Sequence, residues 1–314
     1  MQIYQIEYPI SQDNFQPSVI AIGYFDGVHL GHQQVISRAC EKANELNLPC
    51  GVMTFSPHPK EVLGIGAKID QITPLESKLK LFEKMGIDIC YIVHFTKHFA
   101  AITPEQFIED ILIKLNVKGV VVGFDYTFGD KGVGNPETLR DYAEGRYTVD
   151  IIEPIFDQGK KVSSTRIRNL LASGKVSEVK RLLGRNYSFL GKVIHGQKLG
   201  RTIGFPTANL ELLEHYTLIK NGVYVVRVKN KGRSFLGLMN VGFKPTVNDK
   251  KVTSYEIHIL DFNEDIYGQV LEVELLEYIR EEIKFKNIDQ LKEQIKKDLF
   301  SLHSWYNYAI LHKG

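Results

Sequence analysis

The chain has 314 residues, of which 43% are hydrophobic and 24% charged, and its formal net charge is +2. A charge this close to zero gives no electrostatic basis for binding a nucleic acid or a membrane surface, so neither partner is expected. No apolar run approaches the roughly 18 residues that span a bilayer, and residues 1–8 lack the pattern of a secretory signal. A chain this long usually forms more than one core, which predicts a two-domain cytoplasmic protein.

The first half of the chain alternates short apolar runs with amphipathic stretches. Runs of this kind are typical of strands buried on both faces of a parallel sheet, with the amphipathic stretches as covering helices. Thr103 before Pro104 places a capping hydroxyl ahead of a proline that favours the first helical position. The expected strands are residues 19–22, 51–55, 90–95, 119–123 and 149–152, and the expected helices are residues 33–46, 75–85, 104–115, 136–143 and 165–171.

The stretch Gly23-Tyr-Phe-Asp-Gly-Val-His29-Leu-Gly-His32 joins the first expected strand to the first expected helix. Glycines let the backbone approach a ligand closely, and a helix N-terminus offers unpaired N–H groups to an anion. A bare His-x-x-His pair is more often two ordinary loop residues. At this glycine-rich junction, however, the pair resembles the His-x-Gly-His signature of the nucleotidylyltransferase superfamily. A structural zinc site is disfavoured, because no cysteine or further histidine lies nearby.

Two further loops follow strands of the expected parallel sheet, where ligands bind in such folds. His58 lies between two prolines, and a stiff turn and a nucleotide contact are equally good interpretations. In residues 123–129, Asp125 is flanked by aromatic side chains. These could form the edge of a core, or the wall of a pocket for a flat ligand with one polar anchor.

Ser163, Ser164 and Thr165 open the last expected helix of this half. Taken alone, hydroxyls at a helix start do no more than cap its free N–H groups. The three cysteines, Cys40, Cys50 and Cys90, have no Cys-x-x-Cys spacing. We expect them to be buried free thiols in a reducing compartment.

The pattern changes near residue 184, where the domain boundary is expected, giving domains of residues 1–184 and 185–314. Strands of period two replace the helices, with hairpin turns expected at residues 230–232 and 261–265. Strands this closely spaced predict an antiparallel sheet or small barrel, followed by a C-terminal helix from residue 288 to about residue 311. The expected strands are residues 189–194, 223–229, 234–239, 254–260 and 269–276.

Residues 196–209 form a glycine-rich, basic segment that ends in Pro-Thr-Ala-Asn. Its glycines free backbone N–H groups for a phosphate, although a lone glycine loop is weak evidence, and the ending of a Walker loop is missing. Thr207 and Asn209 are neutral oxygen ligands two residues apart, so they point the same way on an extended segment and could complete a Mg²⁺ shell with ATP phosphates. The residues assigned to ATP here are Gly196, Lys198, Gly200, Arg201, Thr207 and Asn209.

Glu256 lies in an alternating stretch in which Ser254, Glu256 and His258 share one face. From alternation alone, Glu256 is a solvated strand residue. A carboxylate that accepts a proton from an alcohol would have the same sequence pattern.

Taken in order, the motifs of both halves resemble the bacterial bifunctional riboflavin kinase/FAD synthetase family over essentially the full length. Beyond those quoted above, residues 163–168 match the family's Ser-Ser-Thr-x-Ile-Arg, and residues 240–246 read Asn-Val-Gly-Phe-Lys-Pro-Thr. The resemblance implies an α/β fold, with a Rossmann-like nucleotidylyltransferase domain followed by a small antiparallel β-barrel kinase domain and a C-terminal helix.

The resemblance also implies two ATP-dependent reactions with Mg²⁺. The barrel would phosphorylate riboflavin to FMN, with Glu256 as base and Thr207 and Asn209 as metal ligands. The first domain would adenylylate FMN to FAD, with charge stabilised by His29, His32 and Arg168. There the ATP contacts would be Gly23, Phe25, Asp26, His29, His32, Ser163, Ser164, Thr165 and Arg168, and the flavin contacts would be Asp125, Tyr126 and Phe128.

Two alternatives stay open from the sequence. One is a nucleotidylyltransferase for another phosphate-bearing acceptor, in which the barrel only binds. The other is a flavin-binding or regulatory protein without catalysis.

Overall fold

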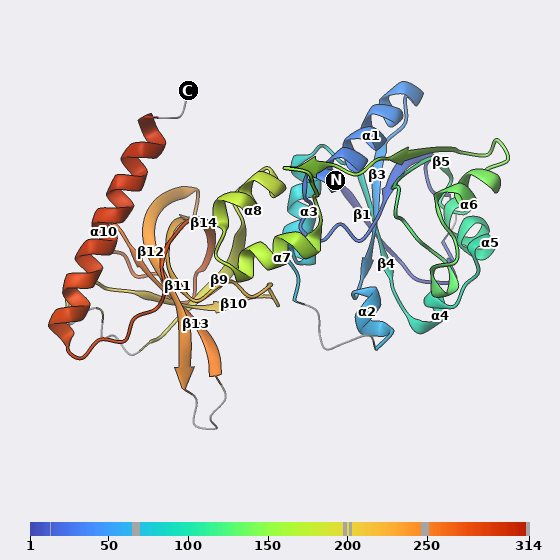
Figure 1. Cartoon of the computed structure of the whole chain (residues 1–314). Coiled ribbons are helices and arrows are strands. Elements are labelled where there is room, and N and C mark those ends of the chain that lie inside the picture. Colours follow the sequence, from blue (N-terminus) through green and yellow to red (C-terminus); the bar gives the residue numbers. More distant parts are fainter. Residues whose placement is uncertain (13, 65–69, 197–199, 201–202, 246–250, 312–314) are drawn as a thin grey trace. The chain divides into compact units, whose positions relative to one another are not determined.

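The computed structural model describes the chain except for residues 13, 65–69, 197–199, 201–202, 246–250 and 312–314 (Figure 1). Contacts within the chain divide it into two compact units, Met1–Ser164 and Thr165–Gly314. The expected boundary at residue 184 lies twenty residues further on, because the helices α7 (Ser164–Ala172) and α8 (Val176–Leu183) belong by their contacts to the second unit. No helix in the described ranges has the length and apolar character needed to cross a membrane.

The first unit is built on a six-stranded sheet in the order β1-β4-β3-β2-β5-β6, and every neighbouring pair is parallel. This confirms the parallel sheet expected from the apolar runs. The edge strand β1 escaped the sequence analysis, because of its residues only Ile6 is buried. The strands are β1 Gln2–Ile6, β2 Ser18–Ile22, β3 Cys50–Ser56, β4 Ile89–His94, β5 Val117–Gly123 and β6 Thr148–Ile152, with a small hairpin of β7 Phe156–Asp157 and β8 Lys160–Lys161.

Helices cover both faces of this sheet (Figure 1). Strand β2 alternates between them: Val19 and Ala21 pack into the core under α1 and α3, whereas Ile20 and Ile22 pack into the core under α4 and α5. A single helix was expected over residues 104–115, but α5 ends early and continues as a π-helical stretch. The helices of this unit are α1 Leu30–Leu46, α2 Pro59–Val62, α3 Leu75–Lys84, α4 Lys97–Ala100, α5 Pro104–Phe107, the π-helix Ile108–Ile113, the 3₁₀ turn Asp130–Gly132 and α6 Pro136–Asp141.

The second unit is a closed antiparallel barrel with strand order β10-β13-β12-β11-β14-β9. The turn between β11 and β12 lies where it was expected: Lys231 and Gly232 have φ of 47° and 78°, as a two-residue hairpin of right-handed twist requires. The strands are β9 Ser188–Ile194, β10 Ala208–Leu212, β11 Gly222–Asn230, β12 Arg233–Pro245, β13 Lys251–Ile259 and β14 Val270–Arg280, and the helices are α7 Ser164–Ala172, α8 Val176–Leu183 and α10 Ile288–Leu311.

The long C-terminal helix α10 packs on the outside of the barrel, shown in red beside the orange strands in Figure 1. Leu302 is fully buried there, and Leu299 and Trp305 pack against the same cluster as Val225 and Leu238 of the barrel wall. This outer face of β11 and β12 is therefore apolar, and α10 removes it from water.

Candidate active sites

The turn between β2 and α1 places two histidines at the start of a helix. His29 is the N-cap of α1, and its Nδ1 accepts a hydrogen bond from the backbone N–H of His32 at 3.3 Å. The two imidazole rings stack with their centroids 3.6 Å apart. Because Nδ1 of His29 is an acceptor, the proton of the neutral ring lies on Nε2, which is thereby a donor suited to phosphate oxygens.

Gly31 explains the spacing of the His-x-Gly-His motif. A Cβ at this position would lie 3.2 Å from Cε1 of His29, a tight contact that the ring of the capping histidine could relieve only by shifting. The glycine thus makes room for the stacked imidazoles, and this role could not be read from the sequence.

The backbone of the same turn is held from several sides. Phe25 and Val28 have positive φ, a conformation that side-chain-bearing residues rarely adopt. Oδ1 of the buried Asp26 accepts hydrogen bonds from the N–H groups of Ile72 and Thr73 at 2.9 and 3.1 Å. These contacts give the Asp26 carboxylate a structural role, and its expected contact with ATP stays a prediction.

Two of the predicted motifs meet at this turn. Ser164, at the start of α7, donates its hydroxyl to the backbone carbonyl of Asp26 at 2.9 Å, which joins the Ser-Ser-Thr element to the histidine turn. Ser163 precedes it, whereas Thr165 and Arg168 lie beyond the division at residue 164. A contact of Arg168 with the nucleotide stays a prediction.

A cavity of about 940 Å³ opens beside the turn. Part of its wall comes from the loops after β2 and β5, whose carboxyl ends meet at one edge of the sheet because these strands are parallel neighbours. Other parts of the wall come from the end of β3 and from α2, α4 and α5. Tyr126 and Phe128 stack at 5.7 Å, and burial raises the pKa of Tyr126. The predicted site residues that line this cavity are Gly23, Phe25, His32, Asp125, Tyr126 and Phe128.

The proline-flanked His58 lies next to the same turn. Its ring centroid is 4.2 Å from that of Tyr24, and its Nδ1 accepts the N–H of Lys60 as the N-cap of α2. These contacts support the stiff-turn interpretation, and the nucleotide contact stays a prediction.

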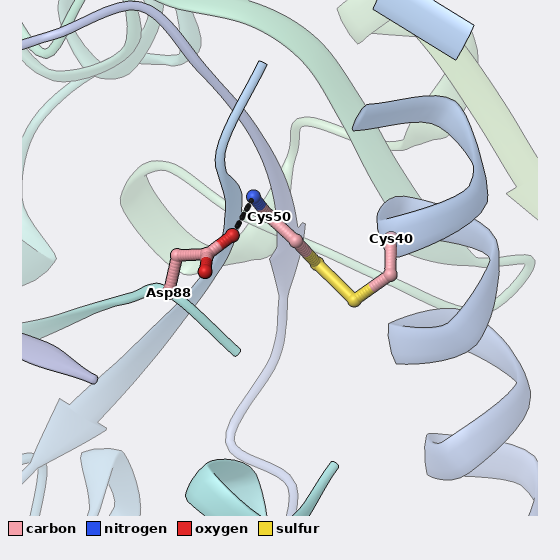
Figure 2. The surroundings of a disulfide bond; sticks show 3 residues. All are labelled: Cys40, Cys50 and Asp88. Atoms are coloured by element: carbon pink, nitrogen blue, oxygen red, sulfur yellow. Dashed lines mark hydrogen bonds between the residues drawn. A yellow bond between two sulfur atoms is a disulfide. The ribbon is translucent and has the colours of Figure 1, made fainter. Parts of the chain in front are cut away.

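The expectation of three free thiols is wrong for two of them. Cys40 of α1 and Cys50 of β3 form a disulfide with their Cα atoms 4.8 Å apart (Figure 2). The spacing of ten residues did not indicate a disulfide, because the two cysteines come together only through the end of α1 and the turn that leads into β3. The backbone N–H of Cys50 is also bound by Asp88 at 2.9 Å. Cys90 is free and buried, as expected, and burial raises its pKa to about 12.

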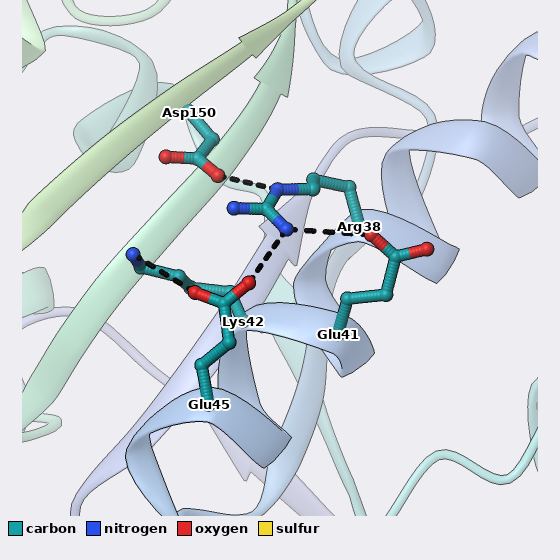
Figure 3. A network of polar contacts seen from close by, with 5 residues as sticks. All are labelled: Arg38, Glu41, Lys42, Glu45 and Asp150. Atoms are coloured by element: carbon teal, nitrogen blue, oxygen red, sulfur yellow. Dashed lines mark hydrogen bonds and ion pairs between the residues drawn. The ribbon is translucent and has the colours of Figure 1, made fainter.

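Helix α1 is also attached on its exposed side. Arg38 donates from Nε to Asp150 of β6 at 2.6 Å and from Nη1 to Glu45 and Glu41 of its own helix (Figure 3). These carboxylates raise the pKa of Arg38. The disulfide and this ion-pair network both join the helix that carries the histidines to strands of the sheet.

In the second unit, strand register brings the predicted kinase residues together. Glu256 of β13 is paired with Asn209 of β10 on one side and with Asn240 of β12 on the other. Directly opposed residues of antiparallel strands have side chains on one face, about 5 Å apart at Cβ. The two amides and the carboxylate therefore form a row across the barrel wall, while Tyr255 and Ile257 are buried.

Thr207 and Asn209 differ in exposure. Thr207 is exposed, whereas Asn209 is buried beside Gly196, where a Cβ would come within 2.2 Å of its side-chain Nδ2. Gly200 lies next to Thr207. Lys198 and Arg201, also assigned to ATP, lie outside the described residues.

Two cavities open beside Thr207, and only the smaller one is lined by residues of this row. One, of about 230 Å³, is lined by Asn240, Glu256, Arg280 and Glu282, and the other, of about 690 Å³, by Pro206, Asp265 and Tyr267. Thr207 lines both, so it lies where they meet.

The sequence analysis missed three residues that shape this site. Asn240 was part of a quoted motif but had no role. His258 binds the carbonyl of Pro206 through Nδ1 at 2.8 Å, which holds the segment that carries Thr207. Arg280 is held at the cavity by two bonds to the buried Asp298 of α10, at 2.8 and 2.6 Å. Cross-strand register and helix docking decide these contacts, and neither has a sequence signal.

Comparison with known proteins decides the family. The FAD synthetase family matches residues 11–166, and the riboflavin kinase family matches residues 183–306. The chain belongs to the bifunctional riboflavin kinase/FMN adenylyltransferase family. The two matches coincide with the sheet that carries the histidine turn and with the barrel that carries Glu256.

Relatives of that name cover nearly the whole chain. The one from Listeria monocytogenes is 42% identical over 95% of this chain and 96% of its own length, and the one from Bacillus subtilis is 43% identical over the same shares. The one from Escherichia coli is 36% identical over 98% of each.

A solved structure shares the fold. It is described as a macrolide-efflux protein from Streptococcus pneumoniae, is 35% identical, and aligns with a TM-score of 0.91 over 97% of this chain and 100% of its own. The efflux activity in that description is that protein's own.

Proposed function

We propose that this chain converts riboflavin to FMN in its barrel and FMN to FAD in its α/β unit, using one ATP in each step and working in the cytoplasm. The observation that carries this proposal is the pair of family matches, one on each unit, and each match contains its own group of polar site residues. The boundary between the two functional domains is proposed at residue 184, next to the start of the riboflavin kinase match.

Glu256 is assigned as the base for the first reaction. An alcohol is a poor nucleophile at neutral pH, and the Glu256 carboxylate would accept the proton of the ribityl 5′-hydroxyl as the oxygen attacks the γ-phosphorus of ATP. Asn209 and Asn240 flank it and orient it by their place in the row. We place the hydroxyl in the smaller cavity and ATP in the larger one, with Thr207 between them.

Thr207 and Asn209 fit a magnesium ion. Mg²⁺ prefers oxygen ligands and keeps water and phosphate oxygens in its shell, so two neutral side-chain oxygens are a suitable share for the protein. In the described residues no cluster of three His, Cys, Asp or Glu side chains could hold a metal. When bound, the ion would neutralise the phosphate charge.

The second reaction needs no base, because the FMN phosphate is already anionic. The α/β unit has to offset the repulsion between two anions and stabilise charge at the α-phosphorus. Hydrogen-bond donors and positive potential would come from Nε2 of His29, from the first turn of α1 and from the ring of His32. The aromatic wall of Tyr126 and Phe128 is assigned to the flavin ring, and bond formation to the FMN oxygen releases pyrophosphate.

The test is to incubate the full chain with riboflavin, ATP and Mg²⁺ and to separate the flavins by chromatography. We expect FMN first and FAD after it, and FAD directly when FMN is supplied. Absence of FMN would reject the kinase assignment, and absence of FAD from added FMN would reject the adenylyltransferase assignment.

The metal assignment has its own test. The substitution Thr207→Val removes the hydroxyl ligand and keeps the shape of the side chain. The Mg²⁺ concentration for half-maximal kinase rate should then rise by about tenfold, which corresponds to the free energy of one modest ligand interaction. The matched control is Thr253→Val, at a half-buried threonine of β13, which should leave this Mg²⁺ concentration unchanged. An identical Mg²⁺ titration for Thr207→Val would contradict the assignment.

A further inference from the structure

Lys78 is a lysine buried inside the first unit. It lies on α3 with 1% of its surface exposed, and its Nζ donates to the backbone carbonyl of Tyr24 at 2.7 Å and to Oγ1 of Thr54 at 3.3 Å. The ammonium also lies 4.3 Å from the centroid of the Tyr24 ring. Among the described residues no carboxylate forms a salt bridge with it.

This burial is unfavourable for the charged form. An ammonium without a carboxylate partner loses hydration that two hydrogen bonds and one aromatic ring replace only in part. Burial lowers the pKa of Lys78 to about 8, and the negative charge of Asp26 opposes this shift. An unbranched apolar side chain would fill the same space without the penalty, so the function of the lysine has to lie in the carbonyl that it binds.

Tyr24 belongs to the turn that presents the histidines. It is followed by Phe25, whose φ is 54°, and the turn reaches Val28, whose φ is 42°. Such conformations persist only where the surroundings hold them. The Tyr24 carbonyl accepts two hydrogen bonds, from Lys78 and from Oγ1 of Thr54 at 3.1 Å, and is therefore a fixed point of the turn.

Residues in and just before α3 form hydrogen bonds with this turn at two places. The N–H groups of Ile72 and Thr73 hold the carboxylate of Asp26, and Lys78 holds the carbonyl of Tyr24. Between them they set the path of the chain into the helix N-terminus. Lys78 does not line the cavity, whereas Tyr24 does, so the lysine reaches the site only through the turn.

We propose that Lys78 is a positioning residue for adenylyl transfer, whose ammonium fixes the Tyr24 carbonyl and thereby the places of His29 and His32. The inference rests on the adenylyltransferase assignment of the α/β unit. It assigns a role to a side chain that does not line the cavity.

The main test is Lys78→Met in the full chain. Methionine keeps the length and apolar stem but cannot donate, so the kcat of FAD formation from FMN should fall about ten- to hundredfold, as displaced catalytic groups do, with little change in KM for ATP. Riboflavin phosphorylation in the same molecule should be unchanged. Lys80→Met, an exposed lysine of the same helix, is the control and should change neither rate.

The pH profile separates positioning from simple loss of folded protein. The titratable groups that face Lys78 are Asp26, the phenol of Tyr24 and the thiol of Cys90, whose pKa burial raises to about 12. As pH rises through 8, Lys78 loses its charge and binds the carbonyl less strongly, so FAD formation by the natural chain should decline there. Lys78→Met should lack this decline, whereas a reduced folded fraction would only scale the whole profile.

Each outcome decides the proposal. A kcat for Lys78→Met within twofold of the natural chain, or a rise in KM for ATP alone, overturns it. If Lys78→Met unfolds, as judged by the amplitude of its thermal transition, Thr54→Val replaces it, because this variant removes the second donor to Tyr24 and keeps the charge. A severalfold drop in the kcat of FAD formation supports the proposal, and an unchanged kcat overturns it. The function assignment fails separately, as absence of FAD formation by the natural chain.

Discussion

The two units hold their polar residues in different ways. In the α/β unit, the candidate site lies on loops that follow strands: His29 and His32 start a helix after β2, and Asp125 follows β5. In the barrel, Glu256 and Asn240 lie within strands, and Asn209 lies in the short strand β10. A loop site can be recognised as one continuous motif, whereas a strand site exists only when several strands pair in the correct register.

The difference also appears in what holds each site. The histidine turn depends on local capping and on long-range anchors such as Lys78 and Asp26. The row around Glu256 depends on the backbone ladder of the barrel itself. Substitutions should therefore separate the two activities cleanly, and the following changes test how far that separation goes.

Glu256→Gln should give the largest effect. The amide keeps the shape of the row but cannot accept the hydroxyl proton, so the kcat of riboflavin phosphorylation should fall by about 10²- to 10⁴-fold. FAD formation from supplied FMN should be unchanged, as measured by chromatography. The substitution Glu211→Gln, at an exposed residue of β10, is the control. If FAD formation also fell in folded Glu256→Gln, the two sites would not be separable.

His29→Asn should follow, with the opposite selectivity. Asparagine is a good N-cap, so α1 should stay intact while the imidazole is lost, and FAD formation should fall by about 10²-fold or more. His29→Ala should lose the same activity and, in addition, about 1 kcal/mol of stability from the missing cap. Kinase activity should be unaffected in both, and the substitution His94→Asn at an exposed histidine serves as control. Equal FAD formation by His29→Asn and the natural chain would leave the cap as the only role of His29.

The smallest effect concerns stability of the α/β unit at alkaline pH. The pKa of Lys78 is about 8 in the folded chain and 10.5 as its ordinary value, so between these pH values the unfolded chain binds more protons and stability rises with pH. From pH 8 to 9 the gain is about 1 kcal/mol. From about pH 8 upward the thiol of Cys90, with its raised pKa in the folded chain, acts in the opposite direction and offsets part of this gain.

Denaturant unfolding at pH 8 and pH 9 measures this gain. Lys78→Met should not show it, whereas Lys80→Met should. Between pH 8 and pH 9 the natural chain should then become more stable and form FAD more slowly. Deprotonation of Lys78 removes the buried charge, but it also weakens the hydrogen bond to the Tyr24 carbonyl. A parallel fall of stability and activity would contradict the assignment of this titration to Lys78.

The sequence was sufficient for the architecture and for the loop motifs. Continuous apolar runs predicted the parallel sheet, and alternation predicted an antiparallel sheet or small barrel. The strands β1 and β10 were missed, and α1 begins at Leu30, three residues before its expected start. The sequence was insufficient wherever residues distant in the chain meet. The Cys40–Cys50 disulfide, the anchoring by Lys78 and the Asn209–Glu256–Asn240 row each depend on docking or register. Lys78 in particular has no sequence signal, because its burial follows from how α3 packs.

The register of β13 has a consequence for folding. A slip by one residue would turn Glu256 into the apolar interior and Tyr255 out to the surface, since side chains alternate along a strand. An unpaired carboxylate inside the barrel is strongly unfavourable, so the group that we assign to proton removal also penalises mispaired intermediates. Recovery of riboflavin phosphorylation during refolding would then report the moment at which the barrel closes in its correct alignment.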